Sequence, residues 1–440
     1  MSARSYASFV GASPGDTGPQ AEDDGLIMTF RRMLLEEVDL NELSKLDANQ
    51  RRARLERVIA HLVSREGVIL STSARNRLIR RVVDEAVGLG VLEPILADAS
   101  VSEIMINGYR TIYVERAGVL ERWPGAFTSE EQLMQTIDRI VSTVNRRVDE
   151  SSPMADARLP ADSRMPRGAR VNVVLPPLAL DGPTVTIRLF PQAISLERLI
   201  EWGSVTEPMA RLLRICVQSR FSIVVSGGTG SGKTTMLNAL SSFIDPSERI
   251  VTVEDAAELS LNQPHTVRLE TRPPNAEGRG QVTIRDLVRN SLRMRPDRIV
   301  VGECRGGEAL DMLQAMNTGH EGSLTTVHAN SAEDALSRLE TLATMSDVQI
   351  PFQAVRDQVN SAIDLIVQLG RSSDGRRRVT EVAYVASRRH EPFRLEPVLE
   401  WNGSHRNRDG RFVHHPLPEG LRRRLSAEHD DLDEWWGHQA

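Results

Sequence analysis

This 440-residue chain has few cysteines and few aromatic residues, and each shortage narrows what it can be. Cys216 and Cys304, its two cysteines, are too few for a disulfide scaffold or a four-thiolate zinc site, and they fit a reducing compartment. Aromatic residues make up 4% of the chain. That scarcity argues against a platform on which single-stranded nucleic acid would stack.

Long hydrophobic runs and a strong excess of charge are missing as well. No uncharged apolar stretch reaches the roughly 18 residues that span a bilayer. The N-terminus, MSARSYASFVGASPGDTG, lacks the apolar core of a secretory signal, so we expect a cytoplasmic protein. The formal net charge of −6 gives no reason to expect a nucleic-acid coat or a polybasic membrane anchor.

What is present is an ordinary globular composition, with 40% hydrophobic and 26% charged residues. From Pro208 onward, helices, strands and glycine loops alternate as in a parallel sheet with crossover helices, and TEVAYVA at 380–386 predicts an edge strand. We therefore expect an α/β protein with this order: a disordered tail (1–25), N-terminal helices (26–75), a smaller α/β domain (76–190), a linker (191–206), a larger domain with a parallel-rich sheet (207–400) and a loosely ordered C-terminal tail (401–440).

The strongest motif is a glycine-rich loop between the apolar strand FSIVV and the helix TTMLNALSSF. Glycines let consecutive backbone N–H groups converge on phosphate oxygens, and the helix points its positive end at the same place. We expect Lys233 to neutralise the β- and γ-phosphates of ATP, and Thr234 to bind Mg²⁺. A dinucleotide-binding interpretation leaves this Lys-Thr pair unexplained. Thr235 directly follows the motif. The pattern G-x-x-x-x-G-K-[ST] is matched by Gly227, Gly228, Thr229, Gly230, Ser231, Gly232, Lys233 and Thr234.

Two later strands end in acidic residues. RIVTVE ends in Glu254-Asp255, and DRIVVGE places Glu303 one glycine beyond four apolar residues. Because the carboxyl ends of parallel strands face the ligand crevice, we expect Glu254 to bind the shell of Mg²⁺ or orient water. We expect Glu303 to polarise the attacking water and to be a metal-binding residue as well. Asp255 also suits the N-cap of a helix, and Glu303 could be a surface residue in a loop.

A strand-end histidine and several arginines complete the candidate site. SLTTVHA places His328 at the end of a strand, where we expect it to sense the γ-phosphate, although an isolated histidine there is more often structural. Phosphoryl transfer builds negative charge that an arginine can neutralise. Arg188, which leads into the linker, is the best placed, and Arg170 and Arg305 are further candidates.

Taken in order, these motifs resemble the secretion-superfamily ATPases of type II and type IV secretion. The match is best to the CpaF/TadA type, which powers assembly of tight-adherence (Flp) pili. The resemblance covers roughly residues 76–390 and rests on the glycine loop and on VTVEDAAEL, RLETRPPNAEGRG, RDLVRNSLRMRPDRIVVGECRGGEALDMLQAMNTGHEGS and LTTVHAN.

The resemblance implies an N-terminal α/β domain joined to a RecA-like ATPase domain, with ATP and Mg²⁺ bound between them in a ring of six chains. By position, Glu254 matches the acidic-box glutamate, Glu303 the Walker-B glutamate and His328 the His-box histidine. Arg188 matches an arginine that the N-terminal domain offers to nucleotide. The ring would dock on polytopic platform proteins at the cytoplasmic face of the inner membrane and drive pilin into a filament.

We therefore expect a hexameric ATPase motor for pilus assembly or protein secretion. Two other classes stay open. A conjugation ATPase or RecA-type helicase would move nucleic acid. The mildly acidic net charge and the scarcity of aromatic residues argue against that class. The second is a ring that binds ATP without steady turnover. The presence of Lys233 and Glu303 argues against it.

Overall fold

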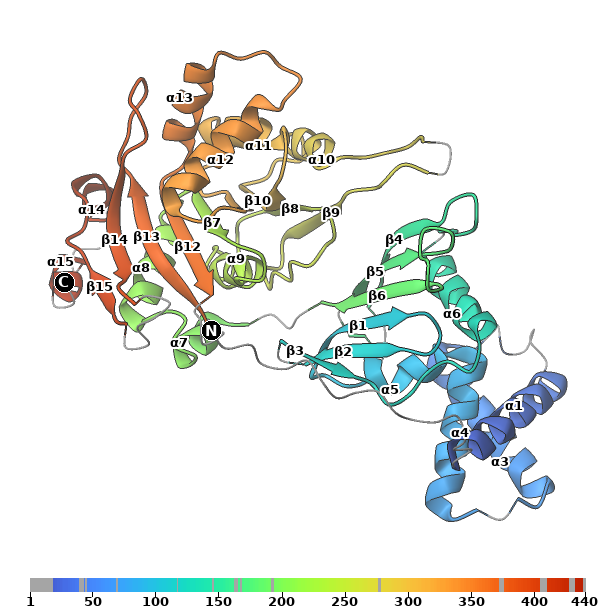
Figure 1. The fold of residues 1–440 in the computed structure, drawn as a ribbon. Helices are drawn as coiled ribbons and strands as arrows, with labels where there is room; N and C mark the ends of the chain where they lie inside the picture. The colour runs from blue at the N-terminus through green and yellow to red at the C-terminus, as the bar shows by residue number, and fades with distance from the viewer. Residues whose placement is uncertain are drawn as a thin grey trace, which may run out of the picture. The chain divides into compact units, whose positions relative to one another are not determined.

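The computed structural model describes residues 19–38, 43, 46–68, 70–116, 118–144, 146–161, 165–166, 168–190, 194–275, 278–371, 376–403, 410–426 and 432–437. The chain divides into two compact units, Met1–Phe190 and Pro191–Ala440, which are described here one at a time (Figure 1). No helix in the described ranges combines the length and the apolar character that crossing a membrane would require.

The N-terminal unit begins with helices α1 (Pro19–Glu37), α3 (Ala48–Arg65) and α4 (Thr72–Val87). Side chains at helical spacing, among them Phe30, Leu34, Ile59 and Val82, bury themselves between the three. The prediction of a disordered tail over 1–25 is wrong for residues 19–25, because α1 already includes them. The rest of that segment, 1–18, lies outside the described residues.

The rest of this unit is one antiparallel sheet with helix α6 (Glu130–Ser142) packed into the same core. A short 3-10 turn (Gly90–Leu92) and α5 (Glu93–Leu96) lead into it. Ser129 caps α6 by accepting a hydrogen bond from the backbone N–H of Gln132. In the order β3-β2-β1-β6-β5-β4, the strands are β1 (Val101–Asn107), β2 (Ile112–Arg116), β3 (Val119–Arg122), β4 (Met154–Leu159), β5 (Ala169–Val174) and β6 (Thr184–Leu189).

The C-terminal unit is built on a nine-stranded sheet of order β15-β14-β13-β12-β7-β11-β10-β8-β9. The strands from β12 to β9 are parallel, and the three at the other side are antiparallel. The expected α/β class with a parallel-rich sheet is confirmed. The strands are β7 (Ile223–Gly227), β8 (Ile250–Glu254), β9 (Thr266–Glu270), β10 (Arg298–Cys304), β11 (Leu324–Val327), β12 (Leu365–Arg371), β13 (Arg377–Val385), β14 (Leu395–Trp401) and β15 (Phe412–His414).

Helices cover both faces of this sheet, which explains why its central strands are apolar throughout. In β7, Ile223 and Val225 belong to the core on one face and Val224 to the core on the other. The first face is covered by α7 (Leu196–Glu201), α8 (Glu207–Gln218), α9 (Lys233–Ser241), α14 (Glu419–Leu425) and α15 (Leu432–Gly437). The second is covered by α10 (Ile284–Ser291), α11 (Glu308–Asn317), α12 (Ala332–Thr344) and α13 (Phe352–Ala362).

Two expectations about the elements of this unit need correction. The segment 191–206, expected to be a linker, contains α7, whose Leu196 and Leu199 are buried in the core; residues 191–193 lie outside the described residues. The strand predicted at 380–386 is not an edge, because β14 and β15 continue the sheet beyond β13.

The C-terminal tail is also packed rather than loosely ordered over its described residues. Trp436 is 2% exposed, and its indole N–H donates to the carbonyl of His415 over 2.8 Å. The Arg211 guanidinium lies 4.4 Å from the ring centroid of Trp435. The polar sequence of the segment predicted a loosely ordered tail, but Trp435 and Trp436 supply enough apolar area to anchor it. Residues 427–431 lie outside the described part of the chain.

Candidate functional site

The glycine loop joins β7 to α9 at the carboxyl end of the parallel strands. A Cβ on Gly227 would lie 2.5 Å from Ser231 Oγ and 2.7 Å from the carbonyl oxygen of Leu369, so the loop turns where only glycine fits. Gly232, at the N-cap of α9, has a φ of 100°, which glycine adopts without strain. Thr229 and Gly230 are exposed, and Thr234 and Thr235 begin α9 half-buried. The backbone N–H groups of this turn can receive an anion.

Lys233 is folded back on the loop itself. Its Nζ donates to the carbonyl oxygens of Gly227, over 2.9 Å, and of Gly228, over 3.0 Å. Burial lowers the pKa of Lys233 below its ordinary value, the nearby charge of Glu303 opposes that shift, and Arg305 adds to it. The ammonium, the loop and Glu303 therefore lie within electrostatic reach of one another in the same unit.

Glu303 lies near the end of β10 and is bound by Arg305. The guanidinium donates to Glu303 Oε2 from Nη2 over 2.7 Å and from Nε over 3.0 Å. The Glu303 side chain is 24% exposed, and Asp255 Oδ2 lies 3.5 Å from Nη1 of the same arginine. Sequence reasoning predicted both Glu303 and Arg305 as site residues but did not foresee that the arginine would hold this carboxylate, because the strand-end loop decides where the guanidinium points.

Glu254, at the end of β8, is 3% exposed. Its Oε1 accepts the backbone N–H groups of Glu258, over 3.1 Å, and Leu259, over 2.9 Å, whereas Oε2 is buried without a hydrogen-bond partner. Burial raises the pKa of Glu254 to about 7, against the two amide hydrogen bonds and Arg268. The buried, unpartnered oxygen fits a group that carries either a proton or a share of a metal's coordination shell.

The raised pKa of Glu254 predicts a pH-dependent stability. A carboxyl whose pKa rises from 4.5 when unfolded to about 7 when folded holds its proton more tightly in the folded state. The stabilisation from that proton is fully present below pH 4.5 and is lost as the pH rises through 7. We expect Glu254→Gln to gain stability over the native chain by a few kcal/mol between pH 5.5 and pH 8, measured by denaturant unfolding. Parallel pH profiles of the two proteins would contradict this.

His328 follows β11, the strand between β7 and β10. Val327, the residue before it, pairs with Ser226 on β7 and with Cys304 on β10. These pairings place His328, which is exposed, at the edge that also carries the glycine loop and Glu303. Its predicted position is consistent with this geometry, whereas its role stays a prediction.

Arg170 and Arg188 lie in the N-terminal unit on the neighbouring strands β5 and β6, where they are exposed cross-strand partners. The register continues from Arg170 to Arg158 on β4. Asp156 Oδ1 lies 3.9 Å from Arg170 Nη2. The sequence singled out Arg170 and Arg188, the middle arginine and one end of this row, without showing that they are neighbours.

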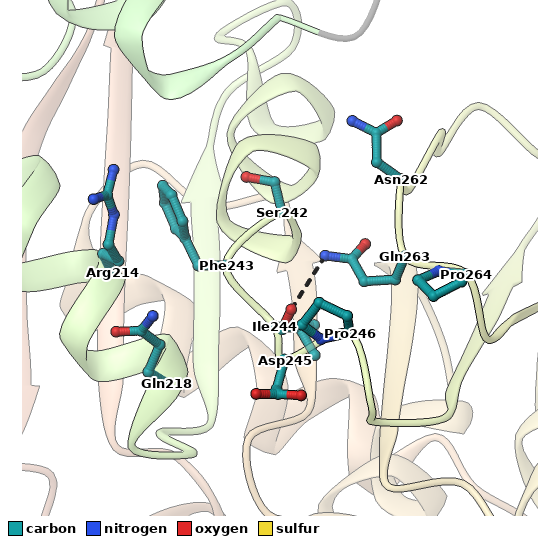
Figure 2. Close-up of a pocket in the computed structure, with 10 residues that line it drawn as sticks. All are labelled: Arg214, Gln218, Ser242, Phe243, Ile244, Asp245, Pro246, Asn262, Gln263 and Pro264. Carbon is teal, nitrogen blue, oxygen red and sulfur yellow. Dashed lines mark hydrogen bonds between the residues drawn. The ribbon is translucent and has the colours of Figure 1, made fainter.

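A pocket of about 610 Å³ lies at the other end of α9 from the glycine loop (Figure 2). Arg214 stacks on Phe243 with 4.7 Å between the guanidinium carbon and the ring centroid, and Gln263 donates to the carbonyl oxygen of Ile244 over 3.4 Å. None of the predicted site residues lines it, so we assign it no part in nucleotide chemistry. The lining residues are Arg214, Gln218, Ser242, Phe243, Ile244, Asp245, Pro246, Asn262, Gln263 and Pro264.

The sequence is similar to proteins of conjugation and secretion systems. A putative conjugal transfer protein of Mycobacterium tuberculosis is 37% identical over 350 residues, which cover 79% of this chain and 97% of that protein. The conjugal transfer protein TrbB of Rhizobium radiobacter is 36% identical over 73% of this chain and 94% of its own. The type IV secretion system protein PtlH of Bordetella pertussis is 36% identical over 67% and 94%, respectively.

One solved structure gives a likeness in fold, and a second is similar in sequence. The pilus retraction motor PilT with bound ADP matches 80% of this chain and 90% of its own with a TM-score of 0.50 at 18% identity. The VirB11 ATPase of the Brucella suis type IV secretion system matches 69% and 96% with a TM-score of 0.36 at 31% identity.

A family model described as type II/IV secretion system protein matches residues 85–413, three quarters of the chain. The match includes the glycine loop, Glu254, Glu303 and His328. It agrees with the secretion-superfamily resemblance drawn from the motifs. The chain therefore belongs to the type II/IV secretion system protein family.

Proposed function

We propose that this protein hydrolyses ATP to drive a secretion or pilus machine. One observation carries the proposal: the charge of Glu303 on β10 reaches the ammonium of Lys233 in the glycine loop, at the carboxyl edge of one parallel sheet. A phosphate-binding cation beside a carboxylate that can orient water is the arrangement that phosphoryl transfer to water needs. Arg305 binds the Glu303 carboxylate, and its Nη1 lies 3.5 Å from Asp255 Oδ2.

The residues fit ATP and Mg²⁺, which supply the phosphoryl group and neutralise its charge. The loop N–H groups and Lys233 would hold the phosphates. Thr234 and the unpartnered Oε2 of Glu254 would hold the metal, with Glu303 near it. Glu303 would accept the proton of the attacking water once Arg305 releases it, and His328 would contact the γ-phosphate.

The arginine row of the N-terminal unit supports a phosphate contact. Arg158, Arg170 and Arg188 are successive cross-strand partners on β4, β5 and β6. Acids offset part of this charge, since Glu103 on β1 is paired with Arg188 and Asp156 Oδ1 lies 3.9 Å from Arg170 Nη2, but the row keeps more arginines than acids. We propose that Arg170 and Arg188 meet the nucleotide phosphates, in a homohexamer of this chain.

We propose that the ATPase drives assembly of a tight-adherence pilus. It would act on pilin only indirectly, through polytopic platform proteins of the inner membrane. The support is the likeness of the motifs at 251–259, 268–280 and 285–323 to the CpaF/TadA type. Conjugation is the second candidate, because similar proteins of Mycobacterium and Rhizobium are described as conjugal transfer proteins.

We further propose that the protein works at the membrane surface, and helices α3 and α4 support this. The five arginines and one acidic residue of α3, with the four arginines and two acidic residues of α4, form a basic region that the net charge of −6 conceals. Arg54 and Arg57, and again Arg77 and Arg80, are exposed one helical turn apart. Each basic residue near an anionic membrane contributes about 1 kcal/mol of attraction.

Cells that carry Glu303→Gln in place of the native gene test the process. We expect them to lose thin surface filaments made of a small pilin, identified by shearing and mass spectrometry. Intact filaments with lost DNA transfer would assign the protein to conjugation, and an unchanged surface, secretome and DNA transfer would refute the proposed function.

Membrane association is tested by fractionating cells in which Arg77→Glu and Arg80→Glu are combined. This variant should leave the membrane fraction. The control Arg338→Glu, which changes an exposed helical arginine of the other unit, should stay in it.

A further inference from the structure

Strand β10 is irregular where it presents Glu303. It pairs with β11 in register at Val301 and Thr325, and the register then shifts before Cys304 meets Val327. The irregularity falls on Gly302 and Glu303, so the ladder alone does not fix the direction of the Glu303 side chain. Another contact has to hold the backbone at this point.

The hydroxyl of Thr326 supplies that contact. Thr326, on β11, is 2% exposed, and its Oγ1 donates to the carbonyl oxygen of Gly302 over 2.7 Å. Against Gly302 lies Glu254: a Cβ on the glycine would come within 2.9 Å of Glu254 Cγ. The peptide before Glu303 is therefore held by a hydrogen bond from Thr326 and closely packed against Glu254.

We propose that Thr326 is a positioning residue that aims Glu303 by fixing the carbonyl of Gly302. The proposal rests on the proposed function, in which Glu303 orients the attacking water. Because the hydrogen bond is partly buried and joins the strand of His328 to the strand of Glu303, losing it frees the irregular backbone to rotate. A small displacement of the carboxylate costs much more in turnover than in nucleotide binding.

The neighbouring threonine provides a matched control. Thr325 is 1% exposed on the opposite face of the same strand, and its hydroxyl lies 3.4 Å from the thiol sulfur of Cys304. Thr325→Val removes the same group from the same strand without touching the bond to Gly302. Strand propensity and side-chain shape are kept in both valine variants.

Steady-state hydrolysis and nucleotide binding test the proposal on the full chain. We expect Thr326→Val to lower kcat at least about tenfold while the Kd of a fluorescent ATP analogue stays within about twofold. Thr326→Ser should restore most of the turnover, and Thr325→Val should keep it. In a Glu303→Gln background, Thr326→Val should have no further effect, because both changes disable the same group.

Each contrary result has a distinct meaning. Native kcat for Thr326→Val beside an inactive Glu303→Gln would overturn the positioning role and leave the proposed function standing. Native turnover in both variants would refute the proposed function itself. Equal losses in the Thr325 and Thr326 variants would show a general effect of strand packing and overturn the proposal.

The comparison of Thr326→Ser with Thr326→Ala covers the case in which the valine variant does not fold. Both lack the methyl group, so they differ only in the hydroxyl that reaches Gly302. A ratio of their kcat values near one would refute the positioning role. A ratio of about tenfold or more in favour of serine, with similar thermal unfolding, would support it.

Discussion

Replacing Lys233 by alanine is expected to raise the Kd for ATP at least about a hundredfold and to abolish turnover, because the ammonium is the loop's charge for the β- and γ-phosphates. The structure adds a second reason. Nζ now bridges the carbonyls of Gly227 and Gly228, so its removal also loosens the turn that aims the N–H groups. The affected property is therefore binding, before any chemical step.

Lys233→Met makes the same test without shortening the side chain, because it removes both the charge and the bridge to the two carbonyls. Methionine keeps the length of the side chain but carries neither the charge nor the donors. Titration with a fluorescent ATP analogue gives the Kd, and thermal unfolding with and without ATP gives an independent measure, because a ligand that binds the folded state raises its melting temperature. A native Kd for the ATP analogue in this variant, together with the native rise in melting temperature on adding ATP, would refute the phosphate-binding role of Lys233.

Local patterns predicted most of the central sheet. The apolar stretches FSIVVS, RIVTVE, DRIVVGE and SLTTVHA became β7, β8, β10 and β11, because parallel strands buried on both faces are apolar throughout. The glycine loop was predictable from its motif between an apolar strand and a helix, and at Gly227 neighbouring atoms leave no room for a Cβ.

Composition misled where a few large side chains outweighed it. Residues 19–25 and the described part of the C-terminal segment looked solvated. Burial of side chains such as Ile27 and Trp436 nevertheless fixes the elements that contain them. The basic region on α3 and α4 was hidden in the net charge, because acidic residues outnumber basic ones in the rest of the chain.

Within the site, the sequence predicted which residues approach the strand ends but not how they bond. That Leu324, Thr326 and His328 share one face follows from the period of a strand. The bond from Thr326 to Gly302 does not, because it depends on the register shift between two strands that are distant in sequence. The pairing of Arg305 with Glu303 depends on a loop conformation in the same way.

Glu303→Gln is expected to lower kcat by about three orders of magnitude and to leave ATP binding intact, since a positioned base contributes roughly 10²- to 10⁴-fold. The amide keeps an oxygen that can accept hydrogen bonds from Arg305, so the local structure should persist. What it loses is the charge that polarises water. The opposite pattern to Lys233→Ala is therefore expected: native Kd with little turnover.

Asp255→Asn is the matched control for Glu303→Gln. Asp255 lies against the same guanidinium at 3.5 Å but is more exposed and follows a different strand. If the loss in Glu303→Gln came merely from disturbing Arg305, both variants would lose turnover to a similar extent. Single-turnover measurements of phosphate release settle the point: a native rate in Glu303→Gln would remove this glutamate from the chemistry, while a slow rate with near-native Asp255→Asn assigns the proton transfer to Glu303.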